Sequence, residues 1–412
     1  MSESDWLKGA TQSRSRSAAD VAAWPLTGVD TKVRENWPQL GCEALVAVGA
    51  DNVTYLSGKS LPFPDCYPDR PAAVVWTSGG PAGLICPADW AEAARAQGWP
   101  GVVLSYDENM GLPPQPLVRA LTELLSERHL SGGCVGLDFE RAPQHLLELL
   151  ETALPAVNWV PCDRWLRDLR MIKTAGEVHL LESVANMAQR VILSPLNHVE
   201  GTISHDGPGY TITEFTERLR VHVCEFGGSV VGHLAAVQGP EAALLFVPPR
   251  GRLTPGNLLR IDLTHHHRGY WSDAGRMAVL GEPTPEQERA YQENLALKAV
   301  AASYLRPGVA CDELWEAVGT AAQREGIRWV ESTEVGHGLG VSHREPPFLS
   351  RSDCTKLAVG MVLVLDIVTL GPLGELMRSK DTFEIVPQGN RLLSWYKDWD
   401  RLYAVTGWRA IH

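Results

Sequence analysis

Short apolar runs alternate with helical periodicities in the first part of the chain. The pattern predicts strands over residues 71–76, 82–86 and 101–105, and helices over 115–128 and 142–153. Residues 43–58, EALVAVGADNVTYLSG, predict a buried strand, a turn and a second strand. Strands that alternate with helices indicate an α/β domain.

A change of pattern near residues 170–175 predicts a domain boundary. After it, apolar residues recur at helical spacing from Val178 to Val191, and Pro195 is expected to end that helix. We therefore expect a flexible arm over 1–20, an N-terminal α/β domain over 21–169 and a second domain over 170–412. The predicted class is α/β (α+β) with two domains.

Two strands of the second domain each carry one aspartate. Residues 258–263 (LLRIDL) and 361–369 (MVLVLDIVT) are apolar runs that contain Asp262 and Asp366. A carboxylate inside such a strand is costly unless it is paired or coordinated, so both aspartates indicate a site. Between them, Thr284 to Gln287 form a capping box that predicts a helix to about Leu305.

Composition narrows the class of protein. A chain of 412 residues, 44% hydrophobic and 21% charged, fits two globular domains. The net charge of −12 argues against nucleic acid or an anionic membrane as a partner. Eight cysteines without a CxxC pair, and no apolar leader or long apolar run, predict a cytoplasmic protein without a membrane span.

Four segments in order carry a family resemblance. They are Asp262 followed by 269–276 (GYWSDAGR), 335–340 (VGHGLG) ending in Glu345-Pro346-Pro347, Gly360 to Asp366, and Arg378 to Asp381. These segments resemble the D…GYxSDxxR, GHGxG…HEPP, GMVxxxE and RxED motifs of the creatinase, prolidase and aminopeptidase P family (M24 peptidases). The resemblance is clear over residues 170–390, and residues 52–58 extend it more weakly into the first domain.

The resemblance implies a creatinase-like N-terminal domain, a C-terminal pita-bread fold and a homodimer. Metallopeptidases of this family hold two divalent ions with two aspartates, a histidine and two glutamates. The matching positions here are Asp262, Asp273, His337, Asp366 and Lys380. Three are kept, Asp366 is a shortened carboxylate, and Lys380 has no lone pair to offer a metal ion.

Lys380 changes the charge of the implied metal site. Three carboxylates and one ammonium give the ligand positions a net charge of −2. The metallopeptidases of the family have four carboxylates at these positions, with a net charge of −4, facing two divalent ions. We therefore expect no metal, with Lys380 protonated and paired to the aspartates. The alternative is one ion, such as Mn, Co or Zn, on Asp273, His337 and Asp366.

Two further departures concern proton transfer. One histidine of the family's hydrolases aligns with Phe246, which cannot transfer a proton, and a second aligns with Arg344. His343 lies one place earlier, and a one-residue offset in a strand turns a side chain to the other face. Arg344 is therefore the expected anion anchor. The run His265-His266-His267 lies on a predicted hairpin with alternate residues outward, which argues against a metal site there.

The sequence therefore predicts a metal-independent enzyme that acts on a small zwitterionic amino-acid derivative, by C–N hydrolysis or a related acid/base step. The candidate catalytic residues are Asp262, Asp273, His337, Asp366 and Lys380. The candidate substrate-binding residues are Phe246, Tyr270, Trp271, His343, Arg344 and Glu345. Two alternatives stay open: an Xaa-Pro peptidase-like enzyme with one metal ion, and a non-catalytic binding protein.

Overall fold

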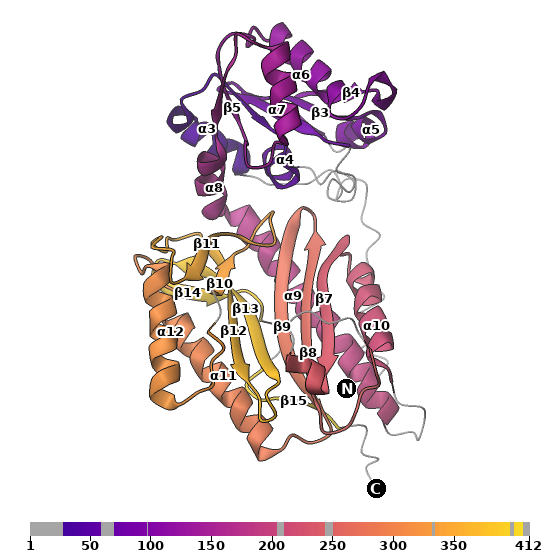
Figure 1. Ribbon diagram of the computed structural model, residues 1–412, viewed down its shortest axis with the longest axis vertical. Helices are drawn as coiled ribbons and strands as arrows, with labels where there is room; N and C mark the ends of the chain where they lie inside the picture. The colour runs from indigo at the N-terminus through magenta and orange to yellow at the C-terminus, as the bar shows by residue number, and fades with distance from the viewer. Residues whose placement is uncertain are drawn as a thin grey trace. The chain divides into compact units, whose positions relative to one another are not determined.

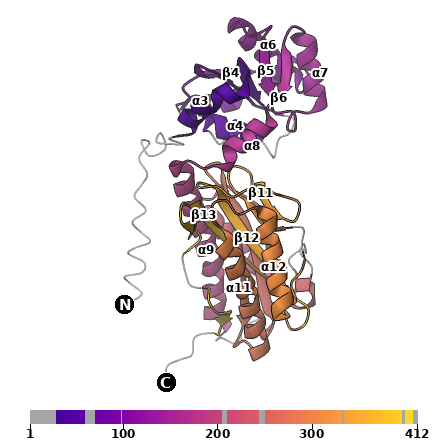
Figure 2. The same cartoon turned by 90° about the vertical axis from the view of Figure 1, so that its left-hand side faces the viewer.

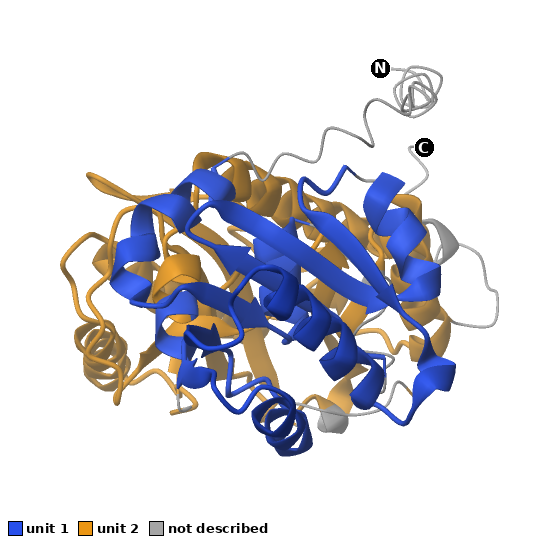
Figure 3. Ribbon diagram, turned by 90° about the horizontal axis from the view of Figure 1, so that it is seen from above, with its two compact units in different colours: residues 1–166 blue, residues 167–412 orange. Residues whose placement is uncertain are grey.

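The computed structural model describes residues 28–58, 70–96, 98–203, 210–243, 250–331, 334–395 and 399–406. The chain divides into two compact units, Met1–Leu166 and Arg167–His412 (Figure 3). The expected arm over 1–20 and the candidate residue Phe246 lie outside the described residues. Within the described residues, none of the helices combines the length and apolar character that crossing a membrane requires.

The first unit is built on a mixed sheet with the order β4-β3-β2-β1-β5-β6. The strands are β1 Ala44–Ala47, β2 Ala73–Thr77, β3 Gly80–Pro87, β4 Val102–Tyr106, β5 Cys134–Leu137 and β6 Asn158–Pro161. The helices are α3 Val29–Leu40, α4 Ala50–Ser57, α5 Ala88–Ala96, α6 Gln115–Glu127, α7 Gln144–Ala153 and α8 Asp163–Met171, with a 3₁₀ turn at Glu108–Met110. α8 contains the division between the units.

One predicted strand of this unit is a helix. The segment after β1 forms α4 in place of a second strand. The buried carboxylate of Asp138 accepts hydrogen bonds from the backbone N–H groups of Val48 and Gly49, at 2.9 Å each, and from the Asn52 amide at 3.1 Å. These bonds hold the turn at which the helix begins. Tertiary context therefore overrides the β-branched composition of the segment.

The second unit contains a largely antiparallel sheet with the order β11-β10-β12-β13-β9-β8-β7 and two further strands, β14 beside β13 and β15 beside β9. The strands are β7 Val230–Gln238, β8 Leu258–His267, β9 Tyr270–Leu280, β10 Glu334–Gly338, β11 Glu345–Ser350, β12 Val362–Leu370, β13 Leu376–Val386, β14 Gly389–Leu392 and β15 Tyr403–Val405. The helices are α9 Ala175–Ile203, α10 Ile212–Glu225, α11 Pro285–Tyr304 and α12 Cys311–Glu325, with a 3₁₀ turn at Gly239–Ala243. The predicted α/β (α+β) class is confirmed.

Helix α9 does not end at Pro195, contrary to the sequence prediction. It continues to Ile203, and Leu196 and Val199 beyond the proline are both buried in the core under α10. Proline in a helix interior costs about 3 kcal/mol, which burial of two large aliphatic side chains offsets. The predicted capping box at Thr284 is present, with its hydroxyl accepting from the Gln287 N–H at 3.2 Å.

The helices of the second unit cover one face of its sheet, which leaves the other face for the site (Figures 1 and 2). Ile261 and Leu263 of β8 pack in the core that α9 and α10 share, while Leu365 and Ile367 of β12 pack against the α11–α12 side. Because side chains alternate along a strand, the residues between them project from the opposite face. Asp262 and Asp366 are such residues.

The hairpin predicted for the 265–267 run is present, since β8 ends at His267 and β9 begins at Tyr270, and its side chains alternate: His265 and His267 are buried, whereas His266 is half-buried. His265 is fully buried, and its Nδ1 lies 2.5 Å from the Ser272 hydroxyl oxygen. Burial lowers the pKa of His265 from 6.5 to about 3, and burial likewise lowers the pKa of His266 to about 4. The neutral imidazole is therefore the form that the fold stabilises.

We predict acid destabilisation that depends on His265. Its folded-state pKa lies below its unfolded value, so its contribution is complete above pH 6.5 and is lost as the pH falls toward 3. Between pH 7 and pH 5 this one group should cost about 2 kcal/mol of unfolding free energy. His265→Asn, which cannot take up the proton, should show a smaller loss over the same range in urea unfolding. An equal loss in parent and variant would contradict the assignment.

Candidate active site

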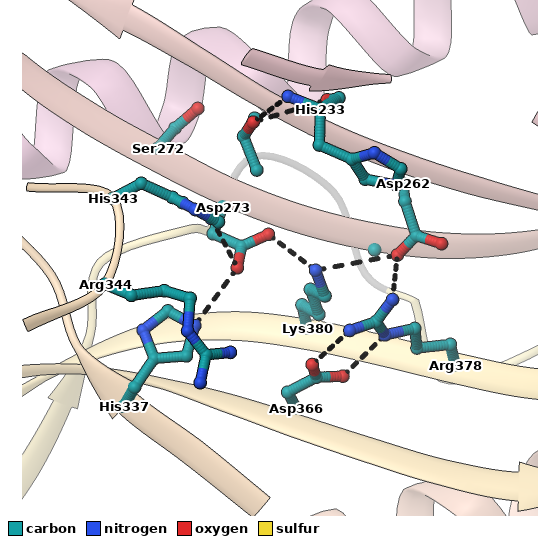
Figure 4. A network of polar contacts seen from close by, with 12 residues as sticks. His233, Asp262, Ser272, Asp273, His337, His343, Arg344, Asp366, Arg378 and Lys380 are labelled. Atoms are coloured by element: carbon teal, nitrogen blue, oxygen red, sulfur yellow. Dashed lines mark hydrogen bonds and ion pairs between the residues drawn. The ribbon is translucent and has the colours of Figure 1, made fainter. Parts of the chain in front are cut away.

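Strands far apart in the sequence bring the candidate residues to one region of the open sheet face. Asp262 comes from β8, Asp273 from β9, His337 from β10, Asp366 from β12 and Lys380 from β13 (Figure 4). The register sets them side by side, because Asp366 pairs with Lys380, and Lys380 pairs in turn with Gly275. All five side chains are buried.

Lys380 bridges two aspartates, as the sequence predicts. Its Nζ lies 2.7 Å from Asp273 Oδ1 and 3.6 Å from Asp262 Oδ1. Burial alone would lower the pKa of Lys380, but Asp273, Asp366 and Asp262 together raise it above its ordinary value. The lysine is therefore a fixed positive charge and is not a neutral nucleophile.

Gly275 makes room for the lysine stem. A Cβ at this position would lie 2.9 Å from Lys380 Cγ and 3.3 Å from Asp262 Oδ1. Its backbone conformation is ordinary, so close packing is the reason for a residue without a side chain.

Arg378 holds Asp366 in a bidentate ion pair. Arg378 Nε lies 2.8 Å from Asp366 Oδ1, and Nη2 lies 2.5 Å from Oδ2. Burial would raise the pKa of Asp366, but Arg378 and Lys380 lower it below its usual value. Both carboxylate oxygens are engaged, so the one-ion ligand set expected from the sequence, which included Asp366, is not the one that the structure brings together.

Asp262 lies among three cationic side chains. Arg260 Nε approaches it at 3.2 Å, Arg378 Nη1 at 3.3 Å and Lys380 Nζ at 3.6 Å. Three buried carboxylates (Asp262, Asp273 and Asp366) thus face three cations (Arg260, Arg378 and Lys380). Their formal charges sum to zero, which leaves no excess negative charge for a pair of divalent ions.

Asp273 Oδ2 faces two imidazoles. It lies 3.3 Å from His337 Nε2 and 3.2 Å from His343 Nε2. His337 Nδ1 lies 3.0 Å from the Gly338 carbonyl oxygen, which can only accept, so Nδ1 carries a proton. Nε2 of a neutral His337 then directs its lone pair at a carboxylate oxygen. Such an arrangement requires a proton or a metal ion between the two atoms.

His343, and not Arg344, faces Asp273. The expectation rested on strand alternation, but residues 341–344 form a series of bends that precedes β11. Alternation does not apply to such a segment. Arg344 Nη1 pairs with Glu334 Oε1 at 2.6 Å, and about half of the Arg344 side chain is exposed. Strand β11, which follows these bends, lies close to β10, and a Cβ on Gly338 would lie 2.4 Å from the Pro346 carbonyl oxygen.

Two other predicted substrate-binding residues have buried partners. Glu345 binds Arg170 at 2.6 Å and Lys173 at 2.7 Å, and the Tyr270 hydroxyl donates to Glu177 Oε1 at 2.9 Å. Burial would raise the pKa of Glu345, but Lys173 and Arg170 lower it below its usual value. Residues 170–177 thus hold the edge strand β11 through Glu345 and the inner strand β9 through Tyr270.

Trp271 is the predicted substrate-binding aromatic that lies beside the histidines. Its ring is 6.0 Å from the ring of His343 and 5.1 Å from that of His266. The indole is half-buried. The described part of the site therefore has an aromatic border on the side of β9 that carries Asp273.

Three site residues were missed by sequence reasoning. Arg378 is two positions before Lys380 on one strand, and Arg260 is two positions before Asp262, so period-two alternation places each pair on one face. His233, on β7, also faces the site near Asp262 (Figure 4). Burial lowers the pKa of His233, with Asp262 opposing this change and Lys380 and Arg378 adding to it. The strand that carries His233 was not among the predicted elements.

Comparison with known proteins agrees with this architecture. Residues 183–386 match the profile of metallopeptidase family M24, and residues 31–172 match the creatinase/prolidase N-terminal domain. The chain belongs to the M24 metallopeptidase family. The resemblance seen in the motifs is confirmed.

The relatives are distant but extend over most of the chain. An uncharacterized peptidase of Bacillus subtilis, YqhT, is 22% identical over 88% of this chain and 96% of its own. An Xaa-Pro dipeptidase of Pyrococcus horikoshii is 24% identical over 61% of this chain and 70% of its own. The X-Pro aminopeptidase structure from Thermotoga maritima superposes with a TM-score of 0.76 at 17% identity, covering 91% of this chain and 99% of that one.

The family implies two metal ions, and the residues present do not fit two. Asp366 is engaged by Arg378, and Lys380 Nζ lies between Asp262 and Asp273. One ion fits better. Within the described residues, Asp273, His337 and His343 form the single group of three metal-ligating side chains whose atoms converge. The Oδ2–Nε2 distances of 3.3 and 3.2 Å match the separation of about 3.3 Å between tetrahedral ligands that bind zinc at about 2.0 Å.

The His337 Nδ1–H bond to a backbone carbonyl is the outer contact that commonly orients a metal-binding histidine. Lys380 serves similarly on the carboxylate side, since it holds Asp273 Oδ1 and leaves Oδ2 toward the imidazoles. The donor chemistry therefore suits one divalent ion with nitrogen and oxygen ligands.

We predict that Lys380→Gln destabilises the protein when chelator is present. The change removes a buried cation and leaves Asp262 and Asp273 under-compensated, which should cost about 3–5 kcal/mol. Urea unfolding in EDTA measures the loss, and Lys356→Gln, an exposed lysine, is the matched control. A Lys380→Gln variant as stable as the control would contradict the role of Lys380 as the central counter-charge.

Proposed function

We propose that the protein is a hydrolase that cleaves a C–N bond in a small peptide-like substrate, with one divalent ion held by Asp273, His337 and His343. The observation that carries the proposal is the convergence of Asp273 Oδ2, His337 Nε2 and His343 Nε2, because both nitrogen atoms lie at a distance from Oδ2 that suits a shared divalent ion. Family membership and relatives named as Xaa-Pro dipeptidases support peptide chemistry. Family membership and these relatives favour a peptidase-like enzyme with one metal ion over the metal-independent enzyme that we expected from Lys380.

In this proposal each residue of the site has a separate role. An ion at the three-residue group would act as a Lewis acid toward a substrate carbonyl. Lys380 holds Asp273 in place, and Arg378 holds Asp366 away from the ion. Trp271 and His343 border the substrate with aromatic surface, which suits the side chain or ring of a dipeptide.

His233 is our candidate for proton transfer to the leaving nitrogen. Burial lowers the pKa of His233 below 6.5, so the imidazole is mainly neutral near pH 7 and can take up a proton from the attacking water and pass it to the leaving nitrogen. The charge of Asp262 favours the imidazolium that forms between these two transfers. It would take over the task for which Phe246 is unsuitable. Lys380 and Arg378, with their fixed charges, cannot perform this step.

A metal-free hydrolysis is the second candidate, and the neutral charge balance of the site favours it. The three cations already compensate the three carboxylates. A proton shared between His337 and Asp273 would resolve the opposition of their lone pairs without an ion. In that case the charged groups alone would stabilise the developing oxyanion.

Metal stoichiometry tests the proposal. After loading with Zn, Mn or Co and desalting, we expect about one equivalent per chain by elemental analysis, because the donor set offers one three-ligand site. His343→Ala should lower metal affinity at least about tenfold, whereas His145→Ala, an exposed histidine, should not. Turnover of Xaa-Pro and other dipeptides should stop in EDTA and return with the ion.

Other outcomes of this test are equally informative. Turnover that survives chelation at negligible metal content would establish the metal-free candidate. Two tightly bound equivalents would contradict our interpretation of Lys380 and Arg378. No turnover across the dipeptide panel, with metal bound, would overturn the assignment of peptide substrates.

We predict that His233→Asn lowers kcat by at least about a hundredfold with little change in KM, because proton transfer is removed while substrate contacts remain. The limb of the pH–rate profile that reports the imidazole should disappear. His222→Asn, on α10, is the control histidine. A parallel rise in KM with an unchanged pH profile would instead indicate a binding role.

A further inference from the structure

We propose that Cys42 and Cys134 in the first unit form a thiol pair that a hydroperoxide or a small-molecule disulfide oxidises to an intramolecular disulfide. The two Sγ atoms lie 3.4 Å apart although the residues are 92 positions apart in the sequence. This inference concerns the N-terminal unit and does not depend on the proposed hydrolase activity.

The sheet itself brings the two thiols together. Cys42 lies two residues before β1, and Cys134 is the first residue of β5. β1 and β5 are parallel neighbours in the register Ala44 to Val135, and the Glu43 N–H donates to the Cys134 carbonyl at 2.9 Å. The pair is therefore positioned by two central strands.

Disulfide formation needs little movement. The bond length is about 2.05 Å, so the sulfur atoms must approach by about 1.4 Å. The register places Glu43 beside Cys134, so Cys42 is offset by one residue; a strand spacing of about 4.8 Å and a rise of about 3.3 Å combine to a Cα separation of roughly 6 Å, which disulfides span. Small side-chain rotations at the strand ends can supply this approach, without a change in strand pairing.

The two sulfurs differ in access. Cys134 is partly exposed, whereas Cys42 is buried and its thiol donates toward the Leu40 carbonyl. Burial and the neighbouring Cys134 raise the pKa of Cys42 to about 12. Cys134 is therefore the residue that meets the oxidant first, and Cys42 is the resolving thiol.

The chemistry balances with one two-electron oxidant. The Cys134 thiolate attacks one peroxide oxygen, the O–O bond breaks, and Cys134 becomes a sulfenic acid while water or an alcohol leaves. The sulfur of Cys42 then attacks the Cys134 sulfur, the S–O bond breaks, and the Cys42 proton leaves with the oxygen as water. Two thiols and one hydroperoxide thus give one disulfide, one water, and a second water or an alcohol. With a small-molecule disulfide, the Cys134 thiolate attacks one sulfur and one thiol leaves, and Cys42 then displaces the second thiol from Cys134.

The other described cysteines lack such a neighbour. Cys86, Cys162 and Cys311 are buried, while Cys224 and Cys354 are exposed. Among the described cysteines, only Cys42 and Cys134 have sulfur atoms in mutual contact. The pair is also not part of any metal-ligating group of three found within the described residues.

Oxidation of the full-length chain tests the inference. Treatment with hydrogen peroxide or glutathione disulfide should remove two hydrogens in mass and join the Cys42 and Cys134 peptides in a non-reducing digest. The bond closes a long loop, so the melting temperature of the first unit should rise by about 5 °C or more and return after dithiothreitol.

Variants separate the two roles. Cys42→Ser should accumulate Cys134 sulfenic acid, which dimedone traps, whereas Cys134→Ser should yield neither the adduct at residue 42 nor the disulfide. Cys354→Ser, at an exposed cysteine, should behave as the parent. Differential alkylation of the parent provides the same information if either serine variant fails to fold. Persistence of both free thiols under peroxide, or a disulfide that involves other cysteines, would overturn the proposal.

Discussion

The contact between Lys380 and Asp273 is the constraint on which the site depends. One oxygen of Asp273 accepts from the ammonium at 2.7 Å, and the other faces His337 and His343. A cation on one side of the carboxylate thus fixes the direction of the other side. The buried ammonium remains charged only because aspartates from β8, β9 and β12 surround it, so the strand order of the sheet and the charge state of the site are linked.

The compensation of buried carboxylates by buried cations also explains why Arg260 and Arg378 lie beside Lys380. Arg378 takes both oxygens of Asp366, and Arg260 and Arg378 approach Asp262. Burying a single charge is costly, whereas a neutral network with short contacts recovers much of that cost. The result is a family member that keeps the fold and three acidic positions of a two-metal hydrolase while its own side chains supply most of the positive charge.

Motif spacing predicted the positions that meet, because motifs on paired strands keep their register in space. Alternation failed where it was applied beyond strands: the bends at 341–344 turn His343 inward and leave Arg344 with Glu334. Alternation along β13 and β8 would have placed Arg378 and Arg260 on the face of the site, but the sequence prediction did not include these two residues. The helix α4 and the continuation past Pro195 depend on Asp138 and on core packing, contacts that a local reading of the chain does not contain.

The bidentate contact between Arg378 and Asp366 has an evolutionary consequence. Restoring an acidic residue at position 380 would leave Arg378 bound to Asp366, and would leave Arg260 and Arg378 beside Asp262. Several substitutions would have to change together before a second ion could enter, and intermediates on that route would carry unbalanced buried charge. The site can therefore change only through coordinated substitutions, because the loss of any one cation leaves a buried carboxylate without its counter-charge.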